Sequence, residues 1–377
     1  MGNLPIIKNR SVLLCLCFIL CLQFSSGCGP TKPQVVPPEV NHFDLYPKDA
    51  DGLIQVNTFF ATDRSLEDTS TTPLLFGPER GKLTYGTCRI SLPPDHRIGV
   101  LESPSGMRFW EGMNPQKHVM VQETFVSDHD SLFFADIARY VKTSAQRRLF
   151  MFIHGYNVSF EDAARRAGQF AYDLDFTGAA VFYSWPSQAS ISAYTVDETN
   201  IQWTQSNFKR FLQDLMIYSQ ADQIFLMAHS MGNRALTQVL ASLATSKEKQ
   251  ALSTIKEIVF IAPDVDAQVM KNNLIPEINQ SGVPITLYVS SEDRALLASK
   301  KVHGYERAGE SVMIMPNVET IDATQASEDF MGHSYFAQSR AIIGDLYYLF
   351  RDRLRADHRF GLKPIQNENG KYWILQN

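Results

Sequence analysis

The sequence feature that most constrains this chain is a pentapeptide at residues 228–232, with the sequence Ala-His-Ser-Met-Gly. It follows the apolar run 223–227 and precedes a helical pattern over 233–243, so the local order is strand, turn, helix. Small residues two positions before and two after Ser230 let a strand and a helix pass close together. This context is typical of a nucleophile elbow, which exposes a serine hydroxyl at a helix N-terminus. The same residues also fit a plain helix N-cap, so other features of the chain must show whether Ser230 is a nucleophile or a cap.

The N-terminus has the pattern of a targeting segment. Lys8 and Arg10 precede an apolar stretch over 11–24, which is too short to span a bilayer comfortably. Residues 25–28, Ser-Ser-Gly-Cys, resemble a bacterial lipobox, although Ser25 stands where leucine is preferred. We therefore expect a signal peptide over 1–27, a lipidated Cys28 and a membrane-anchored lipoprotein of the cell envelope. The alternatives are an uncleaved anchor or an ordinary signal peptide on a secreted or periplasmic protein.

The remainder of the chain has ordinary globular composition, with 44% apolar and 20% charged residues. The prolines of segment 28–40 predict a stiff tether. We expect one large folded domain over 41–355 and a tail over 356–377. The net charge of −5 becomes −7 without residues 1–27, which argues against a nucleic-acid partner. Cys88 is the one cysteine inside the domain, and no cysteine or histidine spacing indicates a metal site.

Strand and helix patterns alternate along the domain. Strands are expected at 53–61, 83–92, 118–126, 149–153, 179–183, 223–227, 255–261, 284–289 and 311–315. Helices are expected at 132–143, 160–174, 207–219, 233–243 and 337–350. The short, wholly apolar strands predict an α/β fold with a mostly parallel central sheet and helices on both faces. Ligands of such sheets bind beyond the carboxyl ends of the strands.

A serine nucleophile needs a histidine base, and in this architecture the base follows the last strand. His303 precedes the expected last strand and His358 lies past the closing helix. His229 adjoins the serine, so its side chain should point elsewhere. His333, on a loop before the closing helix, is the predicted base. The alternative is an ordinary surface histidine.

The acid that orients the base should follow a late strand. Asp293 comes at the carboxyl end of the penultimate strand and is the predicted triad acid. Asp264 and Asp266 follow the strand before and are the alternatives. Whichever residues are not catalytic are expected to be helix N-caps.

Two backbone N–H groups are expected to bind the oxyanion. Met231, next to the nucleophile, supplies one. The other is assigned to Tyr156 in the turn that follows the strand 149–153, where His154 and Gly155 support it and glycine lets the chain fold back beneath the serine. The alternative is a plain strand-to-helix turn.

Several segments in one order resemble a bacterial family of α/β-hydrolases known as DUF900, a domain of unknown function within the lipase/esterase superfamily. They are residues 150–157, 182–187, 228–234, 288–293 and 332–335, with 59–64 and 83–88 in front. The resemblance spans 52–350. It implies an α/β-hydrolase fold with a triad of Ser230, Asp293 and His333. It implies no substrate, because the fold hosts many chemistries.

These observations predict a serine hydrolase that cleaves small-molecule carboxylic esters through an acyl-enzyme and requires no cofactor. The alternatives are an amidase, peptidase or acyltransferase with the same triad, or a non-catalytic envelope protein that uses the fold for binding. Residues 187–207 match neither strand nor helix patterns and are interpreted as a lid, the wall of an acyl pocket or a surface loop. The sequence indicates neither the natural substrate nor the oligomeric state.

Overall fold

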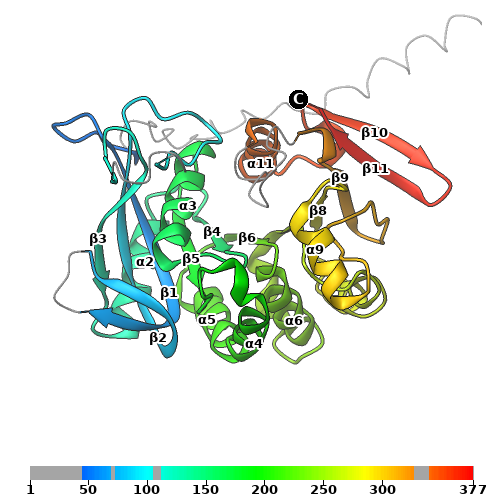
Figure 1. The fold of residues 1–377 in the computed structure, drawn as a ribbon, viewed down its shortest axis with the longest axis horizontal. Coiled ribbons are helices and arrows are strands. Elements are labelled where there is room, and N and C mark those ends of the chain that lie inside the picture. The colour runs from blue at the N-terminus through cyan, green and yellow to red at the C-terminus, as the bar shows by residue number, and fades with distance from the viewer. Residues whose placement is uncertain (1–44, 69–72, 105–111, 327–338, 377) are drawn as a thin grey trace, which may run out of the picture. The chain divides into compact units, whose positions relative to one another are not determined.

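The computed structural model describes residues 45–68, 73–104, 112–326 and 339–376 (Figure 1). The chain divides into two units, Met1–Glu39 and Val40–Asn377, and all described residues belong to the second. Their strands form one eleven-stranded sheet in the order β10-β11-β9-β8-β7-β6-β4-β5-β1-β2-β3. The strands are β1 (Ile54–Asp68), β2 (Leu75–Leu92), β3 (Met120–Val126), β4 (Arg148–Ile153), β5 (Ala179–Ser184), β6 (Gln223–His229), β7 (Ile255–Ile261), β8 (Ile285–Val289), β9 (Val318–Asp322), β10 (Leu362–Asn367) and β11 (Gly370–Leu375).

Helices connect the strands. They are α2 (Asp130–Val141), α3 (Phe160–Asp173), α4 (Tyr194–Trp203), α5 (Gln205–Tyr218), α6 (Gly232–Ala244), α7 (Ala267–Val269), α8 (Ile275–Ile278), α9 (Arg294–His303) and α11 (Arg340–Asp352). The 3-10 helices are η2 (Ile191–Ala193), η3 (Lys249–Thr254), η5 (Asn279–Ser281), η6 (Thr324–Ala326) and η7 (Ala356–His358), and η4 (Met270–Leu274) is a π-helix. No helix of the described part of the chain is long and apolar enough to span a membrane.

The centre of the sheet is parallel, as the sequence predicts. Every neighbouring pair from β1 through β5, β4, β6, β7, β8 and β9 to β11 runs parallel. The pairs β1–β2, β2–β3 and β10–β11 are antiparallel and flank this centre. The register aligns the ends of successive strands, with Ile153 opposite Ala228 and His229 opposite Ile261. The loops that follow β4, β6 and β7 therefore emerge at one edge of the sheet.

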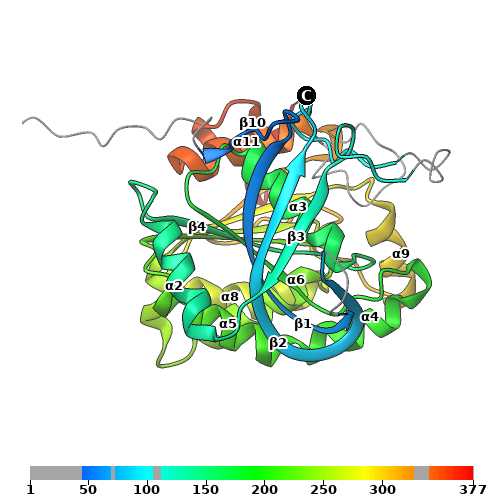
Figure 2. The same ribbon diagram turned by 90° about the vertical axis from the view of Figure 1, so that its left-hand side faces the viewer.

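Both faces of the sheet are buried, and β4 shows why its sequence is a continuous apolar run. Leu149, Met151 and Ile153 belong to the core that holds α2, α5 and α6. Phe150 and Phe152 point the other way, into the core with α3 and α11. Figure 2 shows these two sets of helices on opposite sides of the strands. The α/β-hydrolase architecture with helices on both faces is thereby confirmed.

The expected last strand was placed wrongly. Residues 311–315 are not a strand, and the last strand before α11 is β9, which pairs with β8 from Val318 onward. The chain first crosses the ends of β7 and β8, where Gly309 N donates to Pro263 O and Ser290 N donates to Gly309 O. That crossing leaves 311–315 outside the sheet, and a turn at Asn317, with φ of 58°, returns the chain to it.

Helices α4, α7, α8 and α9 and one hairpin add to the expected elements. Segment 187–207 contains η2 and α4, so the expectation of irregular structure there is wrong. Helix α9 follows β8 and was not expected as an element. The C-terminal segment forms the β10–β11 hairpin, which extends the sheet beside β9.

A buried histidine fixes the long connection after β2 to helix α3. His96 Nδ1 lies 2.8 Å from Glu102 Oε2, and His96 Nε2 lies 2.8 Å from Asp173 Oδ1. Burial opposes a charge here, but hydrogen bonds to Asp173 and Glu102 outweigh it and raise the pKa of His96 to about 9. The ring is therefore an imidazolium at neutral pH, with both nitrogens donating.

Candidate active site

The turn between β6 and α6 has the geometry of a nucleophile elbow. Ser230 has φ of 51°, a left-handed conformation that is costly for a residue with a side chain. Its N–H donates to Ile261 O at 2.9 Å, and its carbonyl accepts from the Asn233 backbone N at 3.1 Å. The Asn233 side chain donates to Ser230 O and Ile261 O at 3.0 and 3.1 Å. The strained turn is thus held from both sides.

Close packing explains the small residues around the serine. A Cβ on Gly232 would lie 2.4 Å from His154 O, so α6 approaches the end of β4 too closely for a side chain. A Cβ on Gly155 would lie 2.9 Å from Ser230 Cβ. Ala228 is fully buried. Alanine at this motif position therefore fits as glycine would.

The predicted oxyanion loop lies directly against the serine. Tyr156 and Ser230 line one cavity of about 200 Å³, between η2–α4 and α9. Among the described residues, neither Tyr156 N–H nor Met231 N–H meets a hydrogen-bond acceptor. Two unused backbone donors on either side of a serine are what an oxyanion hole requires.

His154 supports this loop from behind. Its ring stacks on Trp185, with ring centres 5.1 Å apart, and its Nδ1 lies 2.7 Å from Gly155 O. Trp185 Nε1 donates to His154 O at 2.8 Å. Burial, assisted by the charge of Arg64, lowers the pKa of His154 to about 3, so the ring is neutral. Because Nδ1 faces a carbonyl, the single ring proton lies there.

The sequence does not indicate two buried charged residues that lie behind this loop. Arg64, on β1, donates to Val158 O at 2.7 Å and to Ser187 O at 2.8 Å. Asp197, on α4, accepts from Asn157 N at 3.2 Å and from Ser187 Oγ at 2.6 Å. Burial lowers the pKa of Arg64 to about 10, so it stays charged at pH 7. Arg64 falls in the segment 59–64 that matches the family pattern, which was the one available signal.

The three acidic candidates occupy different environments. Asp293 is 3% exposed, and its Oδ1 caps α9 by accepting from Ala295 N and Leu296 N at 3.0 Å each. The cap uses one carboxylate oxygen. Asp266 caps α7 in the same way, through Gln268 N and Val269 N. The sequence expectation of helix caps therefore describes Asp266 and also Asp293.

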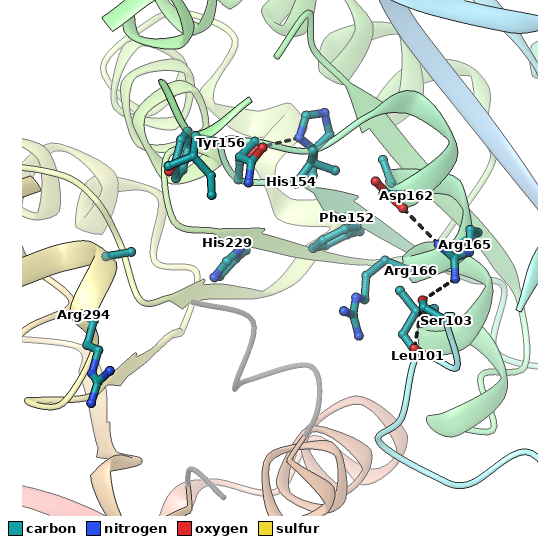
Figure 3. A pocket seen from close by; sticks show the side chains of 16 residues that line it. Leu101, Ser103, Phe152, His154, Tyr156, Asp162, Arg165, Arg166, His229 and Arg294 are labelled. Carbon is teal, nitrogen blue, oxygen red and sulfur yellow. Dashed lines mark hydrogen bonds and ion pairs between the residues drawn. The ribbon is translucent and has the colours of Figure 1, made fainter. Parts of the chain in front are cut away.

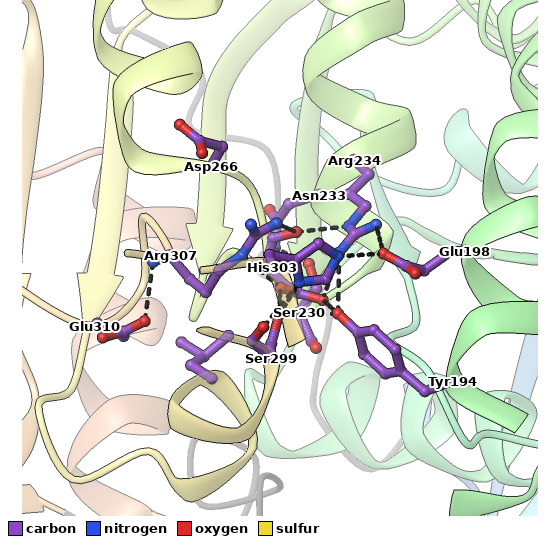
Figure 4. Close-up of polar contacts among 12 residues, drawn as sticks. Tyr194, Glu198, Ser230, Asn233, Arg234, Asp266, Ser299, His303, Arg307 and Glu310 are labelled. Atoms are coloured by element: carbon purple, nitrogen blue, oxygen red, sulfur yellow. Dashed lines mark hydrogen bonds and ion pairs between the residues drawn. The ribbon is translucent and has the colours of Figure 1, made fainter. Parts of the chain in front are cut away.

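Asp264 is the centre of a buried polar network, whose members Tyr194, Arg234, Ser299 and Arg307 are labelled in Figure 4. Its Oδ1 accepts from Ser299 and Arg307 at 2.6 and 2.9 Å. Its Oδ2 accepts from Tyr194 and Arg234 at 2.5 and 3.0 Å. Burial alone would raise the pKa of Asp264, but the two arginines outweigh it and hold that pKa below its ordinary value. A carboxylate offers about four lone pairs, and these donors occupy them.

The histidines are placed as follows. His303, at the end of α9, has Nε2 2.6 Å from Glu198 Oε1 and Nδ1 2.8 Å from Ser299 O. His229 lines a second cavity of about 600 Å³ that also touches Gly155 and Arg166 (Figure 3). His333, the predicted base, lies outside the described residues, as do Cys28, the signal segment and the tether.

Comparison with known proteins gives one family. The model of the family described as alpha/beta hydrolase of unknown function, DUF900, matches residues 131–353. No curated protein matches this chain.

Solved structures similar to this chain include three hydrolases. Esterase B from Lactobacillus Rhamnosis is 11% identical over 79% of this chain and 82% of that one, with a TM-score of 0.31. Phospholipase PlaB from Legionella pneumophila is 12% identical over 61% and 67%, with a TM-score of 0.30. Naproxen esterase from Bacillus subtilis is 8% identical over 83% and 93%, with a TM-score of 0.32. These likenesses carry no inference about the substrate of this chain.

Proposed function

Because this chain belongs to the DUF900 family of alpha/beta hydrolases, we propose that it is a serine hydrolase that cleaves carboxylic esters through an acyl-enzyme. The observation that carries the proposal is the strained left-handed Ser230 at the β6–α6 turn. Strain of this kind persists where the surroundings enforce it, and it clusters at functional sites. Here it presents the serine to a cavity that also holds a candidate oxyanion donor, Tyr156.

The proposed reaction has two halves. Ser230 Oγ attacks the ester carbonyl carbon while the base takes its proton, and the carbonyl electrons move onto oxygen, where Tyr156 N–H and Met231 N–H bind the charge. Collapse expels the alcohol, which receives the proton from the base. Water then attacks the acyl-enzyme with the same assistance and releases the carboxylic acid and free Ser230.

We assign the acid to Asp293 and the base to His333. Asp293 is buried, lies at the carboxyl end of β8 and caps α9 through Oδ1. Asp264 has its acceptor capacity filled by two arginines and two hydroxyls, which suits a structural hub rather than a partner for histidine. His333 is assigned because it follows β9, the last strand before α11, in chain order.

A fluorophosphonate probe tests the proposal. The full-length protein should be labelled on Ser230, as mapped by peptide mass spectrometry, and should hydrolyse p-nitrophenyl esters. Ser230→Ala should abolish both without unfolding the chain, and His333→Ala should lose a similar share of turnover, because a triad acts as a unit. Ser192→Ala is the matched control, since Ser192 is exposed on η2 beside the same cavity. Full activity in folded Ser230→Ala would refute the mechanism.

We further propose that Cys28 carries lipid and attaches the hydrolase to a membrane of the cell envelope. The support is the apolar stretch over 11–24, the Ser-Ser-Gly-Cys junction and the proline-rich segment after it. A single acyl chain anchors weakly, so stable attachment requires the several chains that a bacterial lipoprotein cysteine receives.

A further inference from the structure

The cavity of about 200 Å³ that contains Ser230 has two helical walls. Ile191 and Tyr194, three residues apart on η2–α4, form one wall. Ala295, Ala298 and Val302 form the other, and their spacing of three and four places them on one face of α9. We call this cavity the α4–α9 groove. Asp264 and Ser299 also line the cavity, but Ser299 Oγ donates to Asp264 Oδ1. The rest of the lining is mainly apolar, so the cavity suits a hydrocarbon group.

The outer lip of the groove is also apolar. Ile191 is 75% exposed and Val302 is 63% exposed, each on a different wall. Isolated exposed apolar residues are common, but these two face each other across a cavity that contains a candidate nucleophile. An apolar substrate group that leaves the groove would contact them.

Polar bridges between the walls fix the width of the groove. Tyr194 Oη, from α4, lies 2.9 Å from Ser299 Oγ on α9, and both bond to Asp264. A second bridge joins Glu198 on α4 to His303 on α9 at 2.6 Å. The His303 ring faces an acceptor at each nitrogen. These bridges hold α4 as a fixed wall rather than a swinging lid.

The larger cavity offers a different environment. Arg165, Arg166, Arg294 and His229 line it together with Asp162, and Figure 3 shows the Arg166 side chain directed into it. Charged groups lose hydration when hydrocarbon covers them. An acyl chain attached to Ser230 is therefore better accommodated in the α4–α9 groove.

Resting on the proposed ester hydrolysis, we propose that the α4–α9 groove is the acyl-binding subsite and selects short acyl groups. A cavity of about 150 Å³ accommodates benzene, so about 200 Å³ corresponds to roughly six to eight carbons. Each buried methylene should raise kcat/KM by up to about fourfold until the groove is full. Acyl chains of twelve or more carbons exceed the groove and should be poorer substrates.

The test is a chain-length series of p-nitrophenyl esters, from acetyl to hexadecanoyl, with the full-length protein in detergent. We expect kcat/KM to peak at about six to eight carbons and to fall at least tenfold by dodecanoyl. Ala298→Phe should fill the groove and lower the hexanoyl-to-acetyl ratio of kcat/KM at least tenfold. Leu297→Phe is the matched control, because Leu297 is the neighbouring exposed residue of α9 and does not line the groove.

The outcomes separate the subsite from the reaction. If Ser230 is labelled by fluorophosphonate but the chain-length profile is flat, or is the same in Ala298→Phe as in the parent, the acyl subsite is refuted while the proposed reaction stands. If the parent protein neither reacts with the probe nor hydrolyses any ester, the proposed reaction fails and the subsite fails with it. Ile191→Ser is a second test, because loss of this apolar side chain at the outer edge of the groove should lower turnover of the hexanoyl ester relative to the acetyl ester.

Discussion

Gly155→Ala tests how closely the oxyanion loop must approach the nucleophile. The added methyl carbon would lie 2.9 Å from Ser230 Cβ and 3.0 Å from His229 Nδ1. Non-bonded carbons settle at about 3.5–4.0 Å, so the loop or the elbow has to move by ~0.6 Å or more. The backbone of Gly155 does not have a left-handed φ, so the effect of alanine is steric rather than conformational.

The expected loss follows from what the displacement moves. Tyr156 N–H is the next donor along the loop, and the elbow is held by hydrogen bonds to Ile261 and Asn233 that resist movement. Removing one oxyanion donor costs about 10²–10³-fold in kcat, so misplacing it should cost ~100-fold. KM should change little, because the donor acts mainly in the transition state. Overpacking should lower the free energy of unfolding by about 1–3 kcal/mol.

The assay is steady-state hydrolysis of p-nitrophenyl butyrate, with thermal unfolding measured on the same samples. Gly344→Ala is the matched control, because a Cβ on Gly344 in α11 meets nothing within 4 Å. Alanine there should leave kcat unchanged and stabilise the helix by about 0.5–1 kcal/mol. A Gly155→Ala protein with kcat within a few-fold of the parent would show that the loop does not supply the oxyanion donor.

Further predictions concern the acid, the buried network, pH and the anchor. Asp293→Asn should lower kcat about 10⁴-fold while Asp266→Asn costs far less, and reversed kinetics would move the acid to the earlier strand. Asp264→Asn should lower the free energy of unfolding by roughly 3–5 kcal/mol in urea titrations, since it leaves buried arginines uncompensated. The raised pKa of His96, about 9 against about 6.5 unfolded, contributes stability that is complete below pH 6.5 and disappears as pH rises through 9. His96→Gln should therefore make the urea midpoint less dependent on pH between pH 6 and 9.5. An unaltered pH profile would contradict the raised pKa of His96. Cys28→Ala should move the protein out of the membrane fraction, and an unmodified mature N-terminus at another residue would indicate an ordinary secreted hydrolase.

The sequence predicts the parallel centre of the fold because those strands are buried on both faces. Segments such as 149–153 are therefore apolar at every position, and so short a run favours a buried strand over a helix. Strand β9 was missed because Glu319 interrupts its apolar pattern. Glu319 is tolerated there because Arg355 and Arg359 pair with it, from a part of the chain about forty residues away. The pattern of residues within one strand cannot show an ion pair with such a distant segment.

Helix α4 was missed for a related reason. Asp197 and Asn200 lie on its buried side, which removes the apolar stripe that marks a packed helix. Asp197 accepts a hydrogen bond from Asn157 N in the loop after β4, and Asn200 donates to Pro186 O at 2.6 Å. A helix whose inward face serves a polar site therefore resembles a loop in sequence.

Ion networks on both sides of the serine explain how loops can form a fixed site. Arg64 and Asp197 hold the proposed oxyanion loop. Asp264 joins the turn after β7 to α6 through Arg234 and to α9 through Ser299, and it also pairs with Arg307. Replacing such buried ions by apolar residues often costs no stability, so stability alone gives little reason to retain them. Their bonds are directional, however, and several of them end on backbone atoms of the loops around the serine. We therefore infer that these buried ions are retained because they position the loops around Ser230. Residues that line the groove can then change its size while Ser230, Tyr156 and Met231 keep their geometry.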